Sequence, residues 1–313
     1  MTGRRQSGRR QSGRRPVRLA ALVVVAAVVG GGCGAEATAQ PTVAVSGTPL
    51  PTPVTTTYPL GARAWYAGLV IYLDSALSVI DAGGGYVTVD IRLENPGEDL
   101  ASLGVPILLA SGGTAVEPVR GTIVPDVPGG SSVGTTIQFD VNGAFELARS
   151  AIRIGRAAEH VVVVPLVAGS QDRVTLDPLA LSLSGSASAG ALAVTLTGGE
   201  LRADLPDWGL ELARGTLALT VNYTARYKGD FVGGFAFTGA NIGLRLPDGT
   251  VIAARPDGHS QSVAVLEPAK SVPNLLARFD VPAPGSGTYA LIVKDGSSSA
   301  AIPFTVDGVG PGG

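Results

Sequence analysis

Residues 86–94 read YVTVDIRLE and alternate strictly between apolar and polar side chains. Every second residue of this stretch is apolar: Val87, Val89, Ile91 and Leu93. Successive side chains of a β-strand point to opposite faces of the sheet, so the pattern predicts a half-buried antiparallel strand. The tripeptide Asn95-Pro96-Gly97 follows directly and predicts a turn at the end of that strand.

Segments of the same kind continue on both sides of this stretch, separated by turns rich in Gly, Pro and Asp. Strand-like segments cover residues 65–73, 105–109, 133–141, 160–167, 217–223, 235–246, 289–294 and 301–306. The turns that separate them recur at the spacing typical of all-β domains. Residues 144–150 are compatible with one or two helical turns, and no stretch has the period of a long amphipathic helix. The sequence therefore predicts an all-β fold.

The strands fall into two blocks that resemble a divergent internal repeat. Phe139-Asp140-Val141 in the first block matches Phe279-Asp280-Val281 in the second, and Val164-Pro165 matches Ile302-Pro303 near the two ends. Blocks of this length with frequent turns are typical of immunoglobulin-like sandwiches. We expect two tandem immunoglobulin-like β-sandwich domains after a signal peptide and a flexible linker. The expected boundaries are 60–168 for the first domain, 169–190 for a linker, 191–308 for the second domain and 309–313 for a disordered tail.

The first 33 residues carry the signals of export. Seven arginines lie in residues 1–18, residues 19–29 form an uninterrupted apolar run, and three glycines precede Cys33, the only cysteine of the chain. A basic region, a short apolar region and a small-residue cleavage site together predict a secretory signal peptide. Residues 29–33 (VGGGC) resemble the bacterial lipobox, although Gly30 stands where that consensus prefers Leu. The resemblance implies that Cys33 is a lipid-attachment site.

Other interpretations of this segment stay open at the level of sequence. The apolar run is shorter than the roughly 20 residues that span a bilayer, yet an uncleaved anchor is one alternative. An ordinary signal peptide with a chance cysteine is another. Three Arg-Arg pairs suggest twin-arginine export as an alternative, but the residues after Arg15 match that signal poorly, so Sec export is the default expectation.

The composition of residues 34–59 predicts a spacer after the signal peptide, and the net charge of the chain after residue 33 argues against nucleic acid as a partner. Residues 34–59 are rich in Pro, Thr, Ser, Ala and Gly and carry a single charge, which predicts an extended tether. Removal of residues 1–33 leaves 16 basic against 25 acidic residues, a formal net charge of −9. Nucleic-acid binding requires concentrated Lys and Arg, so we expect no nucleic-acid partner. With one cysteine, no intramolecular disulfide can form.

A family resemblance lies in the residues that decide the fold. The stretch VTVDIRLEN (residues 87–95), Pro128-Gly129 and Phe139-Asp140-Val141 resemble telokin-like immunoglobulin-like domains that follow the lipobox of many bacterial lipoproteins. The second block departs from this pattern, with Thr224-Ala225 and Pro268-Ala269 at the matching places. The resemblance implies two-sheet sandwiches on an exported lipoprotein, and it implies no catalytic activity.

Residues with catalytic or metal-binding spacing are scarce. The two histidines, His160 and His259, have no partner at metal-ligand spacing. Residues 130–134 (GSSVG) match G-x-S-x-G, but a nucleophile elbow needs a preceding strand and a following helix, and here a turn precedes and a strand follows. We therefore expect no enzyme activity, no catalytic residue, no metal site and no cofactor.

Trp208 and its neighbour Asp207 are the candidate contact residues. Trp208 lies in a turn-like segment, residues 204–209 (DLPDWG), where an indole is either part of the core or an exposed anchor for a partner. The expected function is a non-catalytic, lipid-anchored protein on the outer face of the bacterial cell membrane that presents its sandwiches to an envelope protein or the cell wall. The alternative is a carbohydrate-binding module, or a Ca²⁺-dependent adhesive module that uses carboxylates of the loops.

Overall fold

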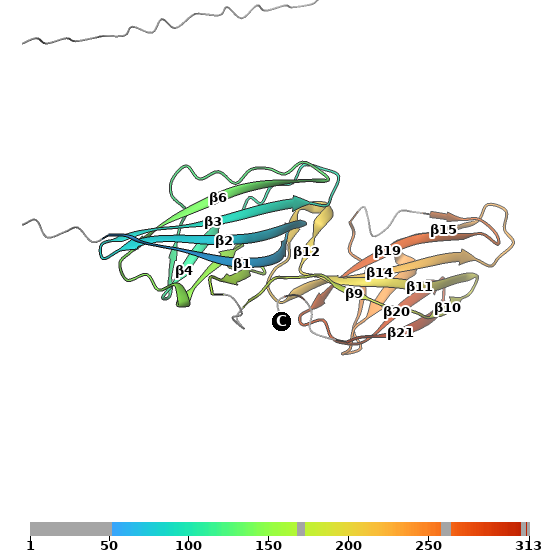
Figure 1. Ribbon diagram of the computed structural model, residues 1–313. Coiled ribbons are helices and arrows are strands. Elements are labelled where there is room, and N and C mark those ends of the chain that lie inside the picture. Colours follow the sequence, from blue (N-terminus) through green and yellow to red (C-terminus); the bar gives the residue numbers. More distant parts are fainter. Residues whose placement is uncertain (1–51, 168–172, 258–263, 308–310, 312–313) are drawn as a thin grey trace, which may run out of the picture. The chain divides into compact units, whose positions relative to one another are not determined.

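The computed structural model describes residues 52–167, 173–257, 264–307 and 311 (Figure 1). Within these ranges the chain is built from antiparallel strands and three short 3₁₀ turns, and it has no α-helix. None of the helical segments in the described ranges has the length and apolar character needed to cross a membrane. The expected all-β, immunoglobulin-like sandwich fold is confirmed. The predicted signal peptide, including Cys33, lies outside the described residues.

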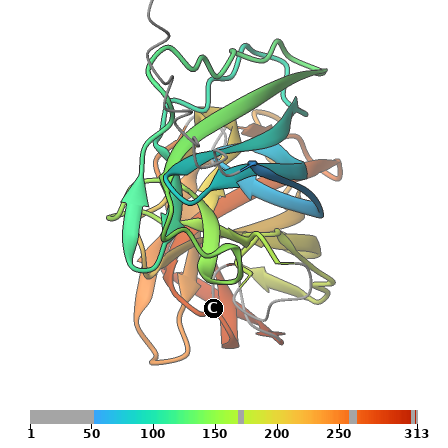
Figure 2. The same ribbon diagram turned by 60° about the vertical axis from the view of Figure 1, so that its left-hand side comes forward.

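The first block contains two four-stranded sheets. One sheet has the order β1-β2-β3-β6, with bounds Val54–Tyr66, Leu69–Asp81, Gly84–Asn95 and Ser131–Asn142. These strands, coloured blue to green, lie next to one another in Figure 1 and in the turned view of Figure 2. The other sheet has the order β5-β4-β7-β8, with bounds Thr114–Val116, Ile107–Ser111, Ser150–Ile154 and Val162–Pro165. A 3₁₀ turn, η1 (Leu147–Arg149), falls within the predicted helical segment.

The second block repeats this arrangement. Its first sheet has the order β10-β11-β14-β19, with bounds Ser186–Ala189, Leu192–Arg202, Thr216–Tyr227 and Ser271–Pro282, and β9 (Leu179–Leu181) pairs with β11. Its other sheet has the order β17-β16-β20-β21, with bounds Val251–Ala253, Ile242–Arg245, Gly287–Asp295 and Ser298–Val306. Two small two-stranded sheets are added: the hairpin of β12 (Asp204–Leu205) with β13 (Leu210–Glu211), and the pair of β15 (Phe235–Phe237) with β18 (Ala264–Leu266).

The alternating stretch lies in β3 as its pattern predicts. Val87, Val89, Ile91 and Leu93 are all at most 2% exposed. They belong to the same hydrophobic cluster as Leu109 and Ile152 from the opposite sheet. Burial of one apolar face from each sheet against the other stabilises the sandwich, at roughly 25 cal/mol for each Å² of apolar surface removed from water.

Equivalent positions of the two blocks carry the repeated motifs. Phe139 of β6 pairs with Val87 of β3, and Phe279 of β19 pairs with Leu219 of β14. Pro165 and Pro303 lie on the edge strands β8 and β21, opposite Ala151 and Ala290 respectively. An edge strand tolerates proline because one side of the strand makes no ladder hydrogen bonds. The two blocks therefore share strand order, the pairing of the Phe of each motif and a proline on the edge strand.

Two predicted boundaries differ from the strands that the structure contains. β1 begins at Val54, inside the predicted tether of residues 34–59, and β9 and β10 lie inside the predicted linker of residues 169–190. The sequence does not predict these strands, because their side chains are largely exposed and show no clear apolar alternation. They are strands because their backbones pair, β1 with β2 and both β9 and β10 with β11. Residue contacts gather Leu50–Gly313 into one unit, so the division into two domains stays a prediction.

The outer half of β1 leads to a first testable prediction. Residues 54–59 pair with residues 75–80 of β2, so a chain that begins at residue 60 should unfold at lower urea concentration than one that begins at residue 52. Each lost backbone hydrogen bond contributes about 1 kcal/mol net, and we expect a total loss on the order of 1–2 kcal/mol because this ladder is solvent-exposed. Equal unfolding midpoints for the two chains would show that the segment is a tether.

Candidate functional site

The β12–β13 hairpin is an insertion between β11 and β14 that has no counterpart in the first block, where a short turn joins β2 to β3. Leu205 and Leu212 of the insertion pack with Ala218 of β14 in a small buried cluster of their own. Ala218 is on the opposite face of β14 from the core residues Leu217 and Leu219. The hairpin is therefore held against the outer face of the second block's first sheet.

Trp208 is presented by a rigid turn at the tip of this hairpin. The turn is the 3₁₀ segment η2 (Pro206–Trp208), with Pro206 at its first position and Gly209 closing it in the left-handed conformation (φ 56°). Proline fixes φ at the start of the turn, and glycine adopts positive φ without the steric penalty of a Cβ atom. The Trp208 side chain is 57% exposed, so it is not part of the core.

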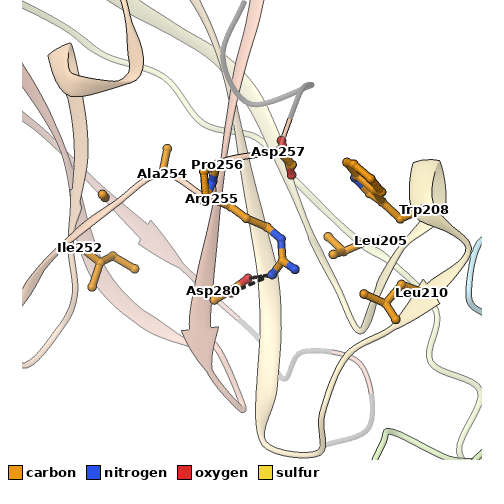
Figure 3. A pocket seen from close by; sticks show the side chains of 10 residues that line it. Leu205, Trp208, Leu210, Ile252, Ala254, Arg255, Pro256, Asp257 and Asp280 are labelled. Atoms are coloured by element: carbon orange, nitrogen blue, oxygen red, sulfur yellow. Dashed lines mark hydrogen bonds and ion pairs between the residues drawn. The ribbon is translucent and has the colours of Figure 1, made fainter.

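An open groove of about 800 Å³ lies beside Trp208. One wall comes from the hairpin (Leu205, Trp208, Leu210), and the other comes from β17 and the segment after it, with Asp280 of β19 between them (Figure 3). Binding sites for small ligands have this size and combine apolar walls with a few placed polar groups. The groove thus has the composition of a binding site.

Charged side chains fix both walls of the groove. The Arg278 guanidinium forms ion pairs with Asp207 of the hairpin and with Asp257, whose Oδ2 lies 3.6 Å from Nη1. On the groove surface, Arg255 Nη1 donates to both carboxylate oxygens of Asp280 at 2.8 Å. Arg278 is itself buried on the sheet, and ion pairs at a partly buried site hold their geometry better than pairs on an open surface. The groove walls are therefore preformed.

The predicted contact residues meet in this region. Trp208 lines the groove, and Asp207 anchors the same turn through Arg278. Sequence reasoning missed Arg255, Arg278 and Asp280, because they come from positions about 50 to 70 residues away along the chain. The turn signal of Pro256-Asp257-Gly258 marks one wall, but nothing in the sequence places it next to Trp208.

The opposite side of the insertion binds the tip of the β1–β2 hairpin. The Ala67 N–H donates to Glu211 Oε2 at 3.0 Å, and the Gly68 N–H donates to Asp204 Oδ2 at 2.6 Å. Gly68 has φ 85°, and a Cβ atom there would lie 2.9 Å from the Pro206 backbone. Glycine is therefore required at this contact. The same short insertion joins the first block to the groove of the second.

An acidic cluster surrounds this contact. Arg202 Nε donates to Asp204 Oδ1 at 2.6 Å, and the Tyr66 hydroxyl donates to Glu159 Oε2 at 2.6 Å. Burial raises the pKa of the Glu211 carboxyl to about 9, and the charges of Asp204 and Glu159 add to that rise. The hydrogen bond from the Ala67 N–H, the second-largest influence, and the charge of Arg202 lower this pKa, but burial outweighs them. Glu211 is therefore neutral at pH 7.

The histidines, the G-x-S-x-G serine and the acidic residues of the sequence analysis form no catalytic or metal site among the described residues. His160 Nε2 lies 2.8 Å from the carbonyl oxygen of Thr216, and its ring is buried. Ser132 lies inside β6, and no helix follows it. In the ranges 52–167, 173–257 and 264–307, no three His, Cys, Asp or Glu side chains gather as metal ligands would. His259 lies outside the described residues.

Comparisons with known proteins assign no family to the chain. No protein-family model matches it, and no curated protein matches it. Among solved structures it is similar to a conserved hypothetical protein from Bacillus anthracis, at 9% sequence identity and a TM-score of 0.27, over 35% of this chain and 91% of that chain. A likeness of this size carries no conclusion about fold or function.

Proposed function

We propose that the protein is a non-catalytic, lipid-anchored protein of the bacterial cell envelope that binds an extracellular partner through the groove beside Trp208. The groove is the observation that carries this proposal. An exposed Trp on a rigid turn, with an apolar wall and fixed ion pairs, has the features of an interaction hot spot. Residues 1–33 support export and attachment of lipid at Cys33.

Lipid attachment has its own test. Mass spectrometry of the mature chain should show a modified N-terminal Cys33, and Cys33→Ser should release the protein from the membrane fraction. An unmodified N-terminus at any other residue would contradict the lipid anchor and leave the binding proposal in place.

Binding is tested by capture from the envelope extract of the source organism. Wild-type chain should retain a specific component that Trp208→Ala fails to retain. Phe231→Ala is the matched control, because Phe231 is also an exposed aromatic residue (66% exposed) but does not line the groove. Equal retention by wild type and by Trp208→Ala would overturn the assignment of the groove.

A further inference from the structure

We propose that the groove beside Trp208 binds an uncharged carbohydrate chain built of hexopyranose rings. This inference deepens the proposed function, on which it rests, because it names the chemical class of the partner. It follows from three features of the groove: the exposed indole with the apolar wall beside it, the hydrogen-bonding groups of Arg255 and Asp280, and the pairing of the charges.

The indole supplies a stacking surface. One face of a pyranose ring presents C–H bonds, which pack on the electron-rich face of an aromatic ring, and Trp offers the largest such face. Trp208 is 57% exposed and is positioned by Pro206 and Gly209, so little conformational entropy is lost on binding. Leu205 and Leu210 continue this apolar wall along the groove (Figure 3).

The polar groups of the groove suit hydroxyl groups. The contact between Arg255 and Asp280 uses only Nη1 of the guanidinium, so within the described residues Nε and Nη2 are available to donate to a ligand. The two oxygens of Asp280, whose side chain is 46% exposed, each have a second lone pair for a ligand O–H group. A planar donor and a planar acceptor held side by side match the adjacent hydroxyl groups of a sugar ring.

The charge balance favours a neutral ligand. Among the described residues, the charged groups of the groove and its anchors are joined in ion pairs: Arg255–Asp280, Arg278–Asp207 and Arg278–Asp257. An anionic polymer would meet guanidinium groups that are already paired with carboxylates here, and a chain of formal net charge −9 after residue 33. The volume of about 800 Å³ accommodates a short segment of a chain rather than a single ring.

The test uses the full chain, purified in detergent, and calorimetric titration with three oligosaccharides. The probes are a β-1,4-linked glucose hexamer, a β-1,4-linked N-acetylglucosamine hexamer and an anionic galacturonate hexamer. We expect at least one neutral hexamer to bind, the anionic hexamer to bind more weakly, and Trp208→Ala to lower the affinity at least about tenfold. Phe231→Ala should leave the affinity unchanged, and Arg255→Met should lower it while circular dichroism stays that of wild type.

The result that overturns the inference is the absence of binding to both neutral hexamers, preferential binding of the anionic hexamer, or an affinity that Trp208→Ala does not change. These outcomes are separable from failure of the proposed function. If neither of the two neutral hexamers binds but Trp208→Ala still abolishes capture of an envelope component, the carbohydrate assignment is wrong and the binding function stands. If Trp208→Ala changes neither measurement, both are wrong.

Discussion

Glu211→Gln should make the protein more stable at pH 8 and remove much of the loss of stability that wild type shows as the pH rises. Glu211 is 5% exposed, and its Oε1 has no hydrogen-bond partner among the described residues. Its pKa of about 9 in the folded chain compares with 4.5 for an exposed glutamate. The folded state therefore holds one more proton than the unfolded state between these two values.

The sign of the effect follows from this proton. Wild-type stability should fall as the pH rises from about 4.5 to about 9, because the unfolded chain releases the proton first. Each pKa unit corresponds to about 1.4 kcal/mol, which sets an upper limit on the order of 6 kcal/mol. Glutamine keeps a carbonyl oxygen for the Ala67 N–H and carries no charge, so the variant should be close to wild type at pH 4 and more stable at pH 8.

Urea unfolding at pH 5, 7 and 9 measures this difference. Glu267→Gln is the matched control, because Glu267 is exposed (59%) and, among the described residues, its side chain pairs only with the exposed Lys270. The control should change stability by less than about 1 kcal/mol at every pH. If wild type and Glu211→Gln keep a constant difference between pH 5 and pH 9, Glu211 does not titrate as its burial implies.

Arg202→Met should destabilise the protein by about 3–5 kcal/mol, the cost of leaving a buried charge without its partner. The side chains of Arg202 and Asp204 are only 10% and 4% exposed, and two nitrogens of Arg202 bond to the Asp204 carboxylate. Arg202 also lies 5.3 Å from the Trp65 ring. Without the guanidinium, Asp204 would lie opposite Glu211, and the Gly68 N–H would be the one remaining hydrogen-bond donor to its carboxylate in the part of the chain that the structure describes.

A second variant separates charge from packing. Arg202→Met combined with Asp204→Asn removes both charges and keeps an oxygen for the Gly68 N–H, so we expect it to recover part of the lost stability. Arg149→Met is the control, because Arg149 and its partner Glu146 are 74% and 61% exposed. It should cost less than about 1 kcal/mol. If Arg202→Met costs no more than Arg149→Met, the contact between the hairpin tip and the insertion does not depend on this ion pair.

The sequence predicts the strands whose side chains alternate. Strand β3 is visible in it because one face of the strand is buried and the other is not, and the pair of Phe-Asp-Val motifs marks equivalent positions of β6 and β19. The outer half of β1 is not visible, because its residues are held by backbone hydrogen bonds and carry little apolar surface. Pattern reasoning detects burial of side chains and misses pairing of the backbone.

Of the residues that line the groove, only Trp208 could be identified as a candidate from the sequence. Trp208 stands out because aromatic residues are rare in this chain, and the Pro-Asp-Trp-Gly turn indicates that it lies at a tip. Whether that tip is buried depends on the insertion packing against Ala218, which no local pattern encodes. Arg255 follows β17 and Asp280 lies in β19, so only the folding of the second block brings the two side chains together. Glu211 lies at the end of a short strand, and nothing in its local sequence indicates that the tip of the β1–β2 hairpin contacts it. Long-range contacts define these roles.

Hydroxyl-radical footprinting on intact cells tests the central claim, that Trp208 contacts a partner in the envelope. Trp208 and Phe231 are both exposed aromatic residues in the isolated chain, at 57% and 66%, so both should oxidise readily in purified protein. On cells we predict that Trp208 is strongly protected while Phe231 oxidises as in the purified protein. Equal oxidation of Trp208 on cells and in the purified chain would contradict the account.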